Sequence, residues 1–283
     1  MKHRLLLLFA LLALQAPMWA IAEENTSEAL VPDEHLRAVV LELKKKRQKP
    51  GDEITKEDLR DIYFLDAKGR GIKDLTGLEH CYNLGEAKLA NNAIQDVAPL
   101  AACRNLQSLD LSNNQIADVT PLGKIEKLQY LNVEHNQIDK LDGLEPLQAL
   151  TCLYASHNRI SSIAPVAKLK KLWTLDLDHN QIQDISPVAE LPRLDSLGLA
   201  HNQIEDVSKL PGGSGMYSTY LHGNKISDIT PLVDLAKHDA EGERRFAAFW
   251  RLYLAGNPLG DDAGTHLAEL EKAGVRLNLE YDR

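Results

Sequence analysis

The stretch LQSLDLSNNQIADVTPL, residues 106–122, decides the fold of this chain because near-copies of it recur every 22 residues. Its frame reads Leu-x-x-Leu-x-Leu-x-x-Asn-x-Ile, with Asn114 as the asparagine. The same place is taken in successive copies by Asn92, Asn114, Asn136, Asn158, Asn180, Asn202 and Asn224. Repeats of this length form the coils of one continuous solenoid, since a single coil cannot bury its apolar side alone.

Each copy predicts one strand followed by one turn. Around Leu109 and Leu111, apolar and polar residues alternate with period two, which is typical of a strand with its leucines inward. Stacked coils about 4.8 Å apart then build a parallel sheet along one face. The asparagine amide offers two donors and an acceptor for turn backbone that no sheet ladder reaches. The step from Asp118 to Pro121 predicts a tight 3₁₀ segment on the opposite face.

Both ends of the repeat array read as caps. Residues 32–47 predict a helix whose basic end, residues 44–47, should be solvated and should complement the helix dipole. A second short helix is expected near residues 55–59, before a degenerate first coil with Arg70 in the place of asparagine. At the other end, a helix over residues 263–273 and a strand over residues 275–279 should close the core.

The frame slips once, between Asn224 and Asn257, which are 33 residues apart instead of 22. The extra residues, about 237–247, are highly charged and are expected to project from their coil. The predicted organisation is a signal peptide at 1–22, an N-terminal helical cap at 23–61, a solenoid of nine coils at 62–259 and a C-terminal cap at 260–283.

The first 22 residues predict export from the cytoplasm. Lys2 and Arg4 precede an apolar run, and Ala20-Ile21-Ala22 fits a cleavage site, as in a secretory signal peptide. A periplasmic or secreted location without membrane insertion follows. Removing Lys2 and Arg4 leaves 30 basic and 41 acidic residues, since the whole chain has 32 and 41, so the net charge moves from −9 to −11. That charge argues against nucleic acid and anionic lipid as partners.

These motifs resemble the 22-residue leucine-rich repeats of bacterial internalins and of the type-1 phosphatase regulatory subunit class. Residues 31–40, 54–59 and 71–79 are similar to the helical cap and first coil of internalin-like proteins. The resemblance implies an α/β fold, a right-handed curved solenoid with a parallel sheet on its concave face, 3₁₀ turns on its convex face and helical caps. It also implies a non-enzymatic binding scaffold, usually extracytoplasmic, without naming a ligand.

The outward strand positions form the expected binding surface, because they differ from coil to coil. Tyrosines and acidic residues are interleaved there, and tyrosine gives large contact area at low entropic cost. The alternative is that these tyrosines only pack on cross-strand neighbours. The candidate partner-binding residues are Tyr130, Glu134, Tyr154, Asp176, Asp178, Tyr220, Arg251 and Tyr253. They suit a protein partner, or a peptide or glycan, and the acidic members favour a basic one.

A column of histidines gives a competing hypothesis. His135, His157, His179 and His201 each precede a repeat asparagine, so they should stack along one edge of the concave face. Imidazoles can bind zinc, nickel or copper, which makes a metal-binding or sensing protein the alternative function. Structural stacking is favoured, so no metal and no cofactor is expected. A structural adhesin module that self-associates is the third alternative.

The remaining chemistry-bearing residues point to no enzyme. The chain has no nucleophile elbow, zinc-protease motif or phosphate-binding loop, and the glycines at 212–215 lack a following lysine. Cys81 and Cys103 stand at the same place of adjacent coils, so a disulfide between them is possible, although two buried thiols fit the coil spacing better. Cys152, at an outward strand position, has no matching partner.

Overall fold

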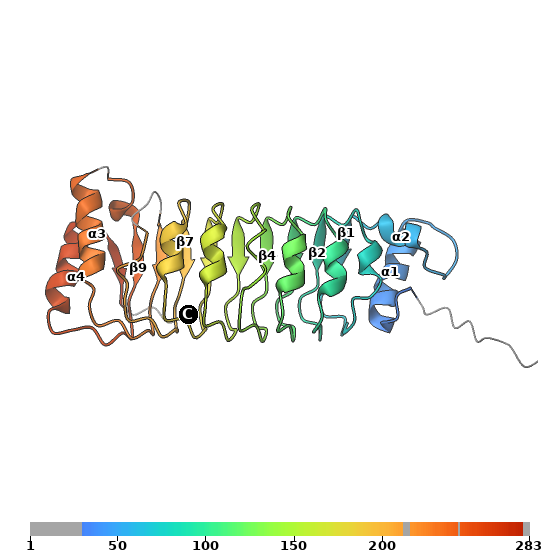
Figure 1. Ribbon diagram of the computed structural model, residues 1–283, viewed down its shortest axis with the longest axis horizontal. Coiled ribbons are helices and arrows are strands. Elements are labelled where there is room, and N and C mark those ends of the chain that lie inside the picture. The colour runs from blue at the N-terminus through green and yellow to red at the C-terminus, as the bar shows by residue number, and fades with distance from the viewer. Residues whose placement is uncertain (1–29, 212–215, 243, 280–283) are drawn as a thin grey trace, which may run out of the picture.

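The computed structural model describes residues 30–211, 216–242 and 244–279, so the predicted signal peptide lies outside the described residues. These residues form one parallel sheet in which every strand pairs with the next along the chain. Its strands are β1 (Phe64–Asp66), β2 (Glu86–Lys88), β3 (Ser108–Asp110), β4 (Tyr130–Asn132), β5 (Cys152–Tyr154), β6 (Thr174–Asp176), β7 (Ser196–Gly198), β8 (Ser218–Tyr220), β9 (Arg251–Tyr253) and β10 (Arg276–Asn278). Figure 1 shows them side by side in one row, which confirms the predicted solenoid.

Short 3₁₀ segments return the chain across the face opposite the sheet, and those that follow Asp96, Asp118 and Asp184 confirm the prediction from the Asp-x-x-Pro steps. They are η1 (Leu78–His80), η2 (Ala98–Ala102), η3 (Thr120–Lys124), η4 (Ala164–Lys168), η5 (Ser186–Glu190) and η6 (Ala247–Phe249). In η3, Asp118 accepts a hydrogen bond from the Thr120 N–H at 2.8 Å, and Pro121 sets φ for the turn. In η3, Gly123 is required because a Cβ there would lie 1.9 Å from the carbonyl oxygen of Gly143 in the next coil.

The core is a column of aliphatic side chains between sheet and turns. The inward residue of each strand is at most 1% exposed from Leu65 in β1 to Leu252 in β9. One member is polar: Thr219 in β8 is fully buried, and its hydroxyl accepts a 2.8 Å hydrogen bond from the indole N–H of Trp250. The next coil therefore satisfies the hydroxyl that replaces a leucine, as a buried polar group requires.

The asparagines form the predicted ladder between coils. The Asn114 amide nitrogen donates to the carbonyls of Leu89, Leu111 and Ser112, and its oxygen accepts from the Ile94 N–H at 3.0 Å. The same four bonds recur at Asn136, Asn158, Asn180, Asn202 and Asn224. Each asparagine thus ties its own turn to the coil before it.

Two helices cover the N-terminal end of the core, α1 (Glu34–Lys46) and α2 (Lys56–Arg60). The expectation that the basic end of α1 is solvated is wrong for Lys44, which is 7% exposed. Its ammonium group donates to the Asp58 carboxylate at 3.0 Å and to the Glu53 carbonyl. Arg70, which replaces the first asparagine, pairs with Glu42 of α1 at 3.0 Å and so joins the first coil to the cap.

Two helices also lie at the C-terminal end, α3 (Thr230–Glu241) and α4 (Ala263–Lys272) (Figure 1). The charged insert was expected to project, and this is a correction: residues 237–241 continue α3, and Lys237 pairs with Glu269 of α4 at 2.9 Å. Asp239 is 7% exposed and accepts hydrogen bonds from the backbone N–H groups of Arg245, Phe246 and Ala247. The insert therefore replaces a 3₁₀ turn with a longer, packed helix.

No helix formed by the described residues has the length and apolar character needed to cross a bilayer.

The three cysteines are unbonded thiols. Cys81 and Cys103 are buried, and burial raises the pKa of both thiols. Both act as small core residues, and the Cys103 thiol lies 3.2 Å from the Leu78 carbonyl.

Candidate functional site

The sheet positions the candidate binding residues on its outer face, called the concave face below. Strand register places Tyr154, Asp176, Gly198, Tyr220 and Tyr253 in one row, each opposite the next. Tyr130 and Arg251 belong to the neighbouring row, because they align with Cys152 and Ser218. The predicted site residues are thus brought onto one surface that runs across β4 to β9.

Two tyrosine pairs flank this surface. The rings of Tyr130 and Tyr154 lie 5.5 Å apart and are tilted by 43°, whereas those of Tyr220 and Tyr253 are stacked at 4.4 Å. Burial raises the pKa of both Tyr130 and Tyr154, so these phenols stay protonated at neutral pH. Both pairs do pack across strands, as the alternative interpretation proposed, and all four rings remain half-buried rather than buried.

Acidic groups lie between the two tyrosine pairs. A Cβ on Gly198 would meet the Asp176 carboxylate at 2.7 Å and the Asp178 carboxylate at 2.8 Å, so these two groups occupy the space above that glycine. Asp178 is only 4% exposed and accepts a 2.8 Å hydrogen bond from the Ala200 N–H. Asp176 is half-buried and is the more accessible of the two.

Glu134 is tied into the surface in the same way as Asp178. Its carboxylate accepts hydrogen bonds from the Ser156 hydroxyl at 2.8 Å and from the Asn132 amide at 2.9 Å. Glu134 and Asp178 therefore lie at the edge of the concave face and hold neighbouring coils together. Arg251, by contrast, is exposed.

The histidine column forms as predicted, with near-parallel rings. Centroids are 4.1 Å apart for His135 and His157, and 4.2 Å apart for each of the next two pairs up to His201. The stack ends at Gly223, where a Cβ would lie 2.5 Å from the His201 ring. His222 then meets His201 edge-on at 5.1 Å.

The backbone conformation explains why histidine is suited to these four positions. All four have φ between 51° and 54°, in the left-handed region that favours glycine, asparagine and histidine. The equivalent position of other coils holds Gly69, Asn91, Asn113, Gly223 and Gly256, all with positive φ. Asn91 and Asn113 show that a residue without an imidazole fills the same place.

The stacked geometry is poorly suited to a metal ion. Zinc needs in-plane nitrogen lone pairs that converge at about 2.0–2.1 Å, whereas parallel rings direct their lone pairs side by side. Among the described residues, no three histidine, cysteine, aspartate or glutamate side chains are arranged to hold a metal.

We expect excess zinc or nickel to leave the melting temperature unchanged. A site of micromolar affinity would instead raise the free energy of unfolding by about 2.7 kcal/mol at a hundredfold excess. Thermal unfolding of the parent and of His179→Asn, each with and without zinc, measures this. A zinc-dependent rise in the parent that the variant lacks would restore the ligand hypothesis.

A second group of exposed aromatics, not predicted from the sequence, lies beside the concave face. Trp173, Tyr217 and Phe249 lie just before β6, β8 and β9, and they are 59%, 45% and 54% exposed. The signal was present in the repeat frame, where Trp173 and Tyr217 hold the position after the first leucine. These positions precede the strands, so the alternation of inward and outward strand residues does not indicate them.

Comparisons with known proteins agree with this architecture. The family model "Leucine Rich repeats (2 copies)" matches residues 83–124, 104–146, 148–189 and 174–212. No curated protein sequence matches the chain significantly. Among solved structures, internalin C2 from Listeria monocytogenes is 30% identical with a TM-score of 0.64, over 74% of this chain and 92% of that one.

Two more distant structures share the fold. Internalin InlF from Listeria monocytogenes is 23% identical with a TM-score of 0.52, over 89% of this chain and 92% of that one. The ectodomain of the plant receptor kinase GASSHO1/SCHENGEN3 from Arabidopsis thaliana, solved in complex with CASPARIAN STRIP INTEGRITY FACTOR 2, is 19% identical with a TM-score of 0.53, over 69% of this chain and 23% of that one.

The repeats, the sheet and the asparagine ladder define a leucine-rich repeat solenoid. Within that class, the chain belongs to the internalin-like leucine-rich repeat family, since it covers nearly all of a solved internalin at 30% identity.

Proposed function

We propose that this protein is a non-enzymatic binding scaffold that holds a basic protein partner on its concave face, outside the cytoplasm. The observation that carries the proposal is the acidic group above Gly198, bounded along its row by Tyr154 and by the stacked Tyr220 and Tyr253. Aromatic faces and carboxylates together suit lysine or arginine side chains, through cation–π contacts and ion pairs. A plant receptor ectodomain with this fold was solved in complex with CASPARIAN STRIP INTEGRITY FACTOR 2, which supports the binding of a protein or peptide by such a solenoid.

Roles within the proposed site differ between its residues. Tyr130, Tyr154, Tyr220 and Tyr253 supply contact area, and Asp176 supplies the accessible negative charge. The Asp178 and Glu134 carboxylates accept hydrogen bonds from the next coil and so hold the strands around them in place. Arg251 is exposed at the rim of the site, where its positive charge would select against a uniformly basic partner. The proposed location outside the cytoplasm rests on the predicted signal peptide, residues 1–22. The limits of the domains are likewise predictions from the sequence.

A pull-down from cell envelope extract tests the proposal. The double variant Tyr154→Ala, Asp176→Ala should lose at least about tenfold in partner recovery, because it removes one aromatic and one carboxylate from the centre of the site. Tyr82→Ala, Asp139→Ala is the matched control, since it deletes the same side-chain types at exposed positions away from the concave face.

Equal recovery of every partner by the parent and both variants would contradict the concave site. Self-association of the parent in light scattering, without any captured partner, would instead favour the adhesin alternative.

A further inference from the structure

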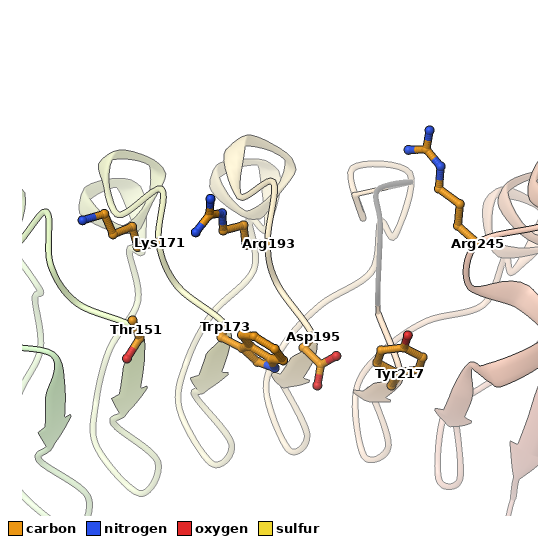
Figure 2. A pocket seen from close by; sticks show the side chains of 7 residues that line it. All are labelled: Thr151, Lys171, Trp173, Arg193, Asp195, Tyr217 and Arg245. Atoms are coloured by element: carbon orange, nitrogen blue, oxygen red, sulfur yellow. The ribbon is translucent and has the colours of Figure 1, made fainter. Parts of the chain in front are cut away.

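A second surface with the opposite charge lies beside the concave face, just before the strands (Figure 2). It is a hollow of about 530 Å³, called the edge hollow below, and its lining is mainly apolar. The residues that line it are Thr151, Lys171, Trp173, Arg193, Asp195, Tyr217 and Arg245. None of them belongs to the proposed concave site.

Two exposed aromatics form the floor of the edge hollow. Backbone hydrogen bonds of 2.9 Å run from the Asp195 N–H to the Trp173 carbonyl and from the Tyr217 N–H to the Asp195 carbonyl. Trp173 and Tyr217 therefore lie two coils apart, about 10 Å at the spacing of neighbouring strands. Phe249 extends the aromatic surface, since its ring meets Tyr217 edge-on at 6.2 Å.

The fold does not require these aromatics. Gln107, Gln129 and Thr151 occupy the position of Trp173 in three preceding coils. A tryptophan that is 59% exposed gains little from burial, so its place here is better explained by contact with another molecule. Trp and Tyr are also the residues that most often dominate binding energy at interfaces.

Basic side chains border the aromatics, in a chain whose net charge is −9. Lys171 and Arg193 stand two residues before Trp173 and Asp195 in adjacent coils, and Arg245 follows α3. All three are exposed. Three cations around apolar surface attract a partner that brings carboxylates together with apolar side chains.

Asp195 lies between Trp173 and Tyr217, so its carboxylate limits which ligands the edge hollow can bind. A polymer with a negative charge on every unit would place one of those charges against this carboxylate. A sugar chain would also need more polar groups for its hydroxyls than a mainly apolar lining provides. A peptide can instead present a backbone N–H to Asp195 while its side chains reach the aromatics and cations on either side.

We propose that the edge hollow binds an acidic, partly apolar segment of a protein partner. The carboxylates of that segment pair with Lys171, Arg193 and Arg245, and its apolar side chains cover Trp173 and Tyr217. The segment runs across the coils from β6 toward β8. This site is independent of the concave face in position and in charge.

Peptide titration of the chain without its predicted signal peptide, which contains Trp19, tests the proposal through the fluorescence of Trp173, since Trp250 is fully buried. The probes are a short peptide that alternates glutamate and leucine, a copy with lysine for glutamate, polyglutamate and polygalacturonate. We expect the glutamate–leucine peptide to bind about tenfold more tightly than the other three, and added salt to weaken it.

Variants separate the hollow from general electrostatic attraction. Arg193→Ala should weaken binding of the glutamate–leucine peptide about tenfold, and so should Trp173→Ala, read by calorimetry because the reporter is lost. Lys127→Ala and Gln129→Ala change the equivalent positions of a coil outside the hollow and should leave affinity unchanged. The concave variant Tyr154→Ala, Asp176→Ala should also bind the peptide normally, whatever becomes of the function proposed above.

Three results would overturn this inference. The glutamate–leucine peptide could fail to bind, the lysine copy could bind equally well, or Lys127→Ala could lose as much affinity as Arg193→Ala. Tighter binding of polygalacturonate would assign the hollow to an anionic glycan instead of a protein.

Discussion

Replacing Asn202 with alanine should lower the free energy of unfolding by about 1–3 kcal/mol, because buried turn groups lose their partner. The Asn202 amide nitrogen donates to the carbonyls of Leu177, Leu199 and Ala200 at 3.0–3.1 Å, and its oxygen accepts from the Ile182 N–H at 3.0 Å. Asn202 is 7% exposed, so water has little access to the groups that alanine leaves behind. Urea unfolding measures the change as a shift of the midpoint without a change of slope.

Two further variants test whether the loss of stability comes from the buried hydrogen bonds of the asparagine. Asn158 makes the same set of bonds but is half-buried, so Asn158→Ala should cost less than Asn202→Ala. Gln137→Ala, next to a ladder asparagine but exposed, should leave stability within about 0.5 kcal/mol of the parent. An Asn202→Ala protein as stable as the parent would remove the asparagine ladder from the account of this fold.

The repeat frame predicted the solenoid because it specifies each coil locally. Leu109 and Leu111 fix which way a strand faces, and Asn114 and Asp118 fix the turn that follows. Since each coil contacts mainly its neighbours, correct local predictions add up to the whole sheet. The family assignment rests on the same residues and is confirmed by the solved internalin.

The sequence failed where contacts depend on elements outside the frame. Lys44 reads as one of four solvated bases, but Asp58 of α2 folds back over it. The insert reads as charged and projecting, yet Asp239 caps the backbone at Ala247 and lets Phe246 and Trp250 pack together at 5.5 Å. No local sequence pattern indicates that Lys44 contacts Asp58 or that Asp239 accepts a hydrogen bond from the backbone of Ala247.

Site residues that follow from the local repeat pattern were predicted, whereas those that depend on contacts between coils were not. The row that contains Tyr154 and Asp176 follows directly from strand alternation, so its members were found. That Asp178 is nearly buried could not be read from the sequence, because it depends on the missing side chain of Gly198. The edge hollow was missed because Trp173 and Arg193 come close only through the coil geometry, at positions that repeat consensus leaves variable.

Acid should destabilise the protein through the histidine column, by about 1–2 kcal/mol between pH 7 and pH 5. Burial, and then the charge that His157 and His201 would carry, lower the pKa of His179 to about 4. The same causes lower the pKa of His157, with burial first and His135 second, although Glu134 and Asp176 act in the opposite direction. An unfolded histidine titrates near pH 6.5, so the unfolded chain takes up protons that His157 and His179 resist in the folded state.

The sign of the effect follows from that difference in proton binding. As pH falls through 6.5 toward 4, the unfolded state binds more protons than the folded state, and the stability of the fold decreases. A full shift of His179 would give about 2 kcal/mol at pH 5, and partial exposure of the ring reduces this. Carboxylates held below their usual pKa, such as Asp58 at about 2, lose their contribution only at lower pH. The interval from pH 7 to pH 5 therefore reports mainly on the histidines.

His179→Asn isolates the column from every other titrating group. Asparagine already occupies the same left-handed position at Asn91 and Asn113, with φ of 57° and 55°, so the backbone of the variant should be preserved. Urea unfolding at several pH values should show a flatter dependence in this variant, because its central imidazole is gone and His157 and His201 lose a neighbour that could carry charge. The control His238→Asn, at an exposed position of α3, should keep the dependence of the parent. If the parent and His179→Asn lose the same stability between pH 7 and pH 5, the stacked imidazoles do not resist protonation, and the acid sensitivity of this fold must originate elsewhere.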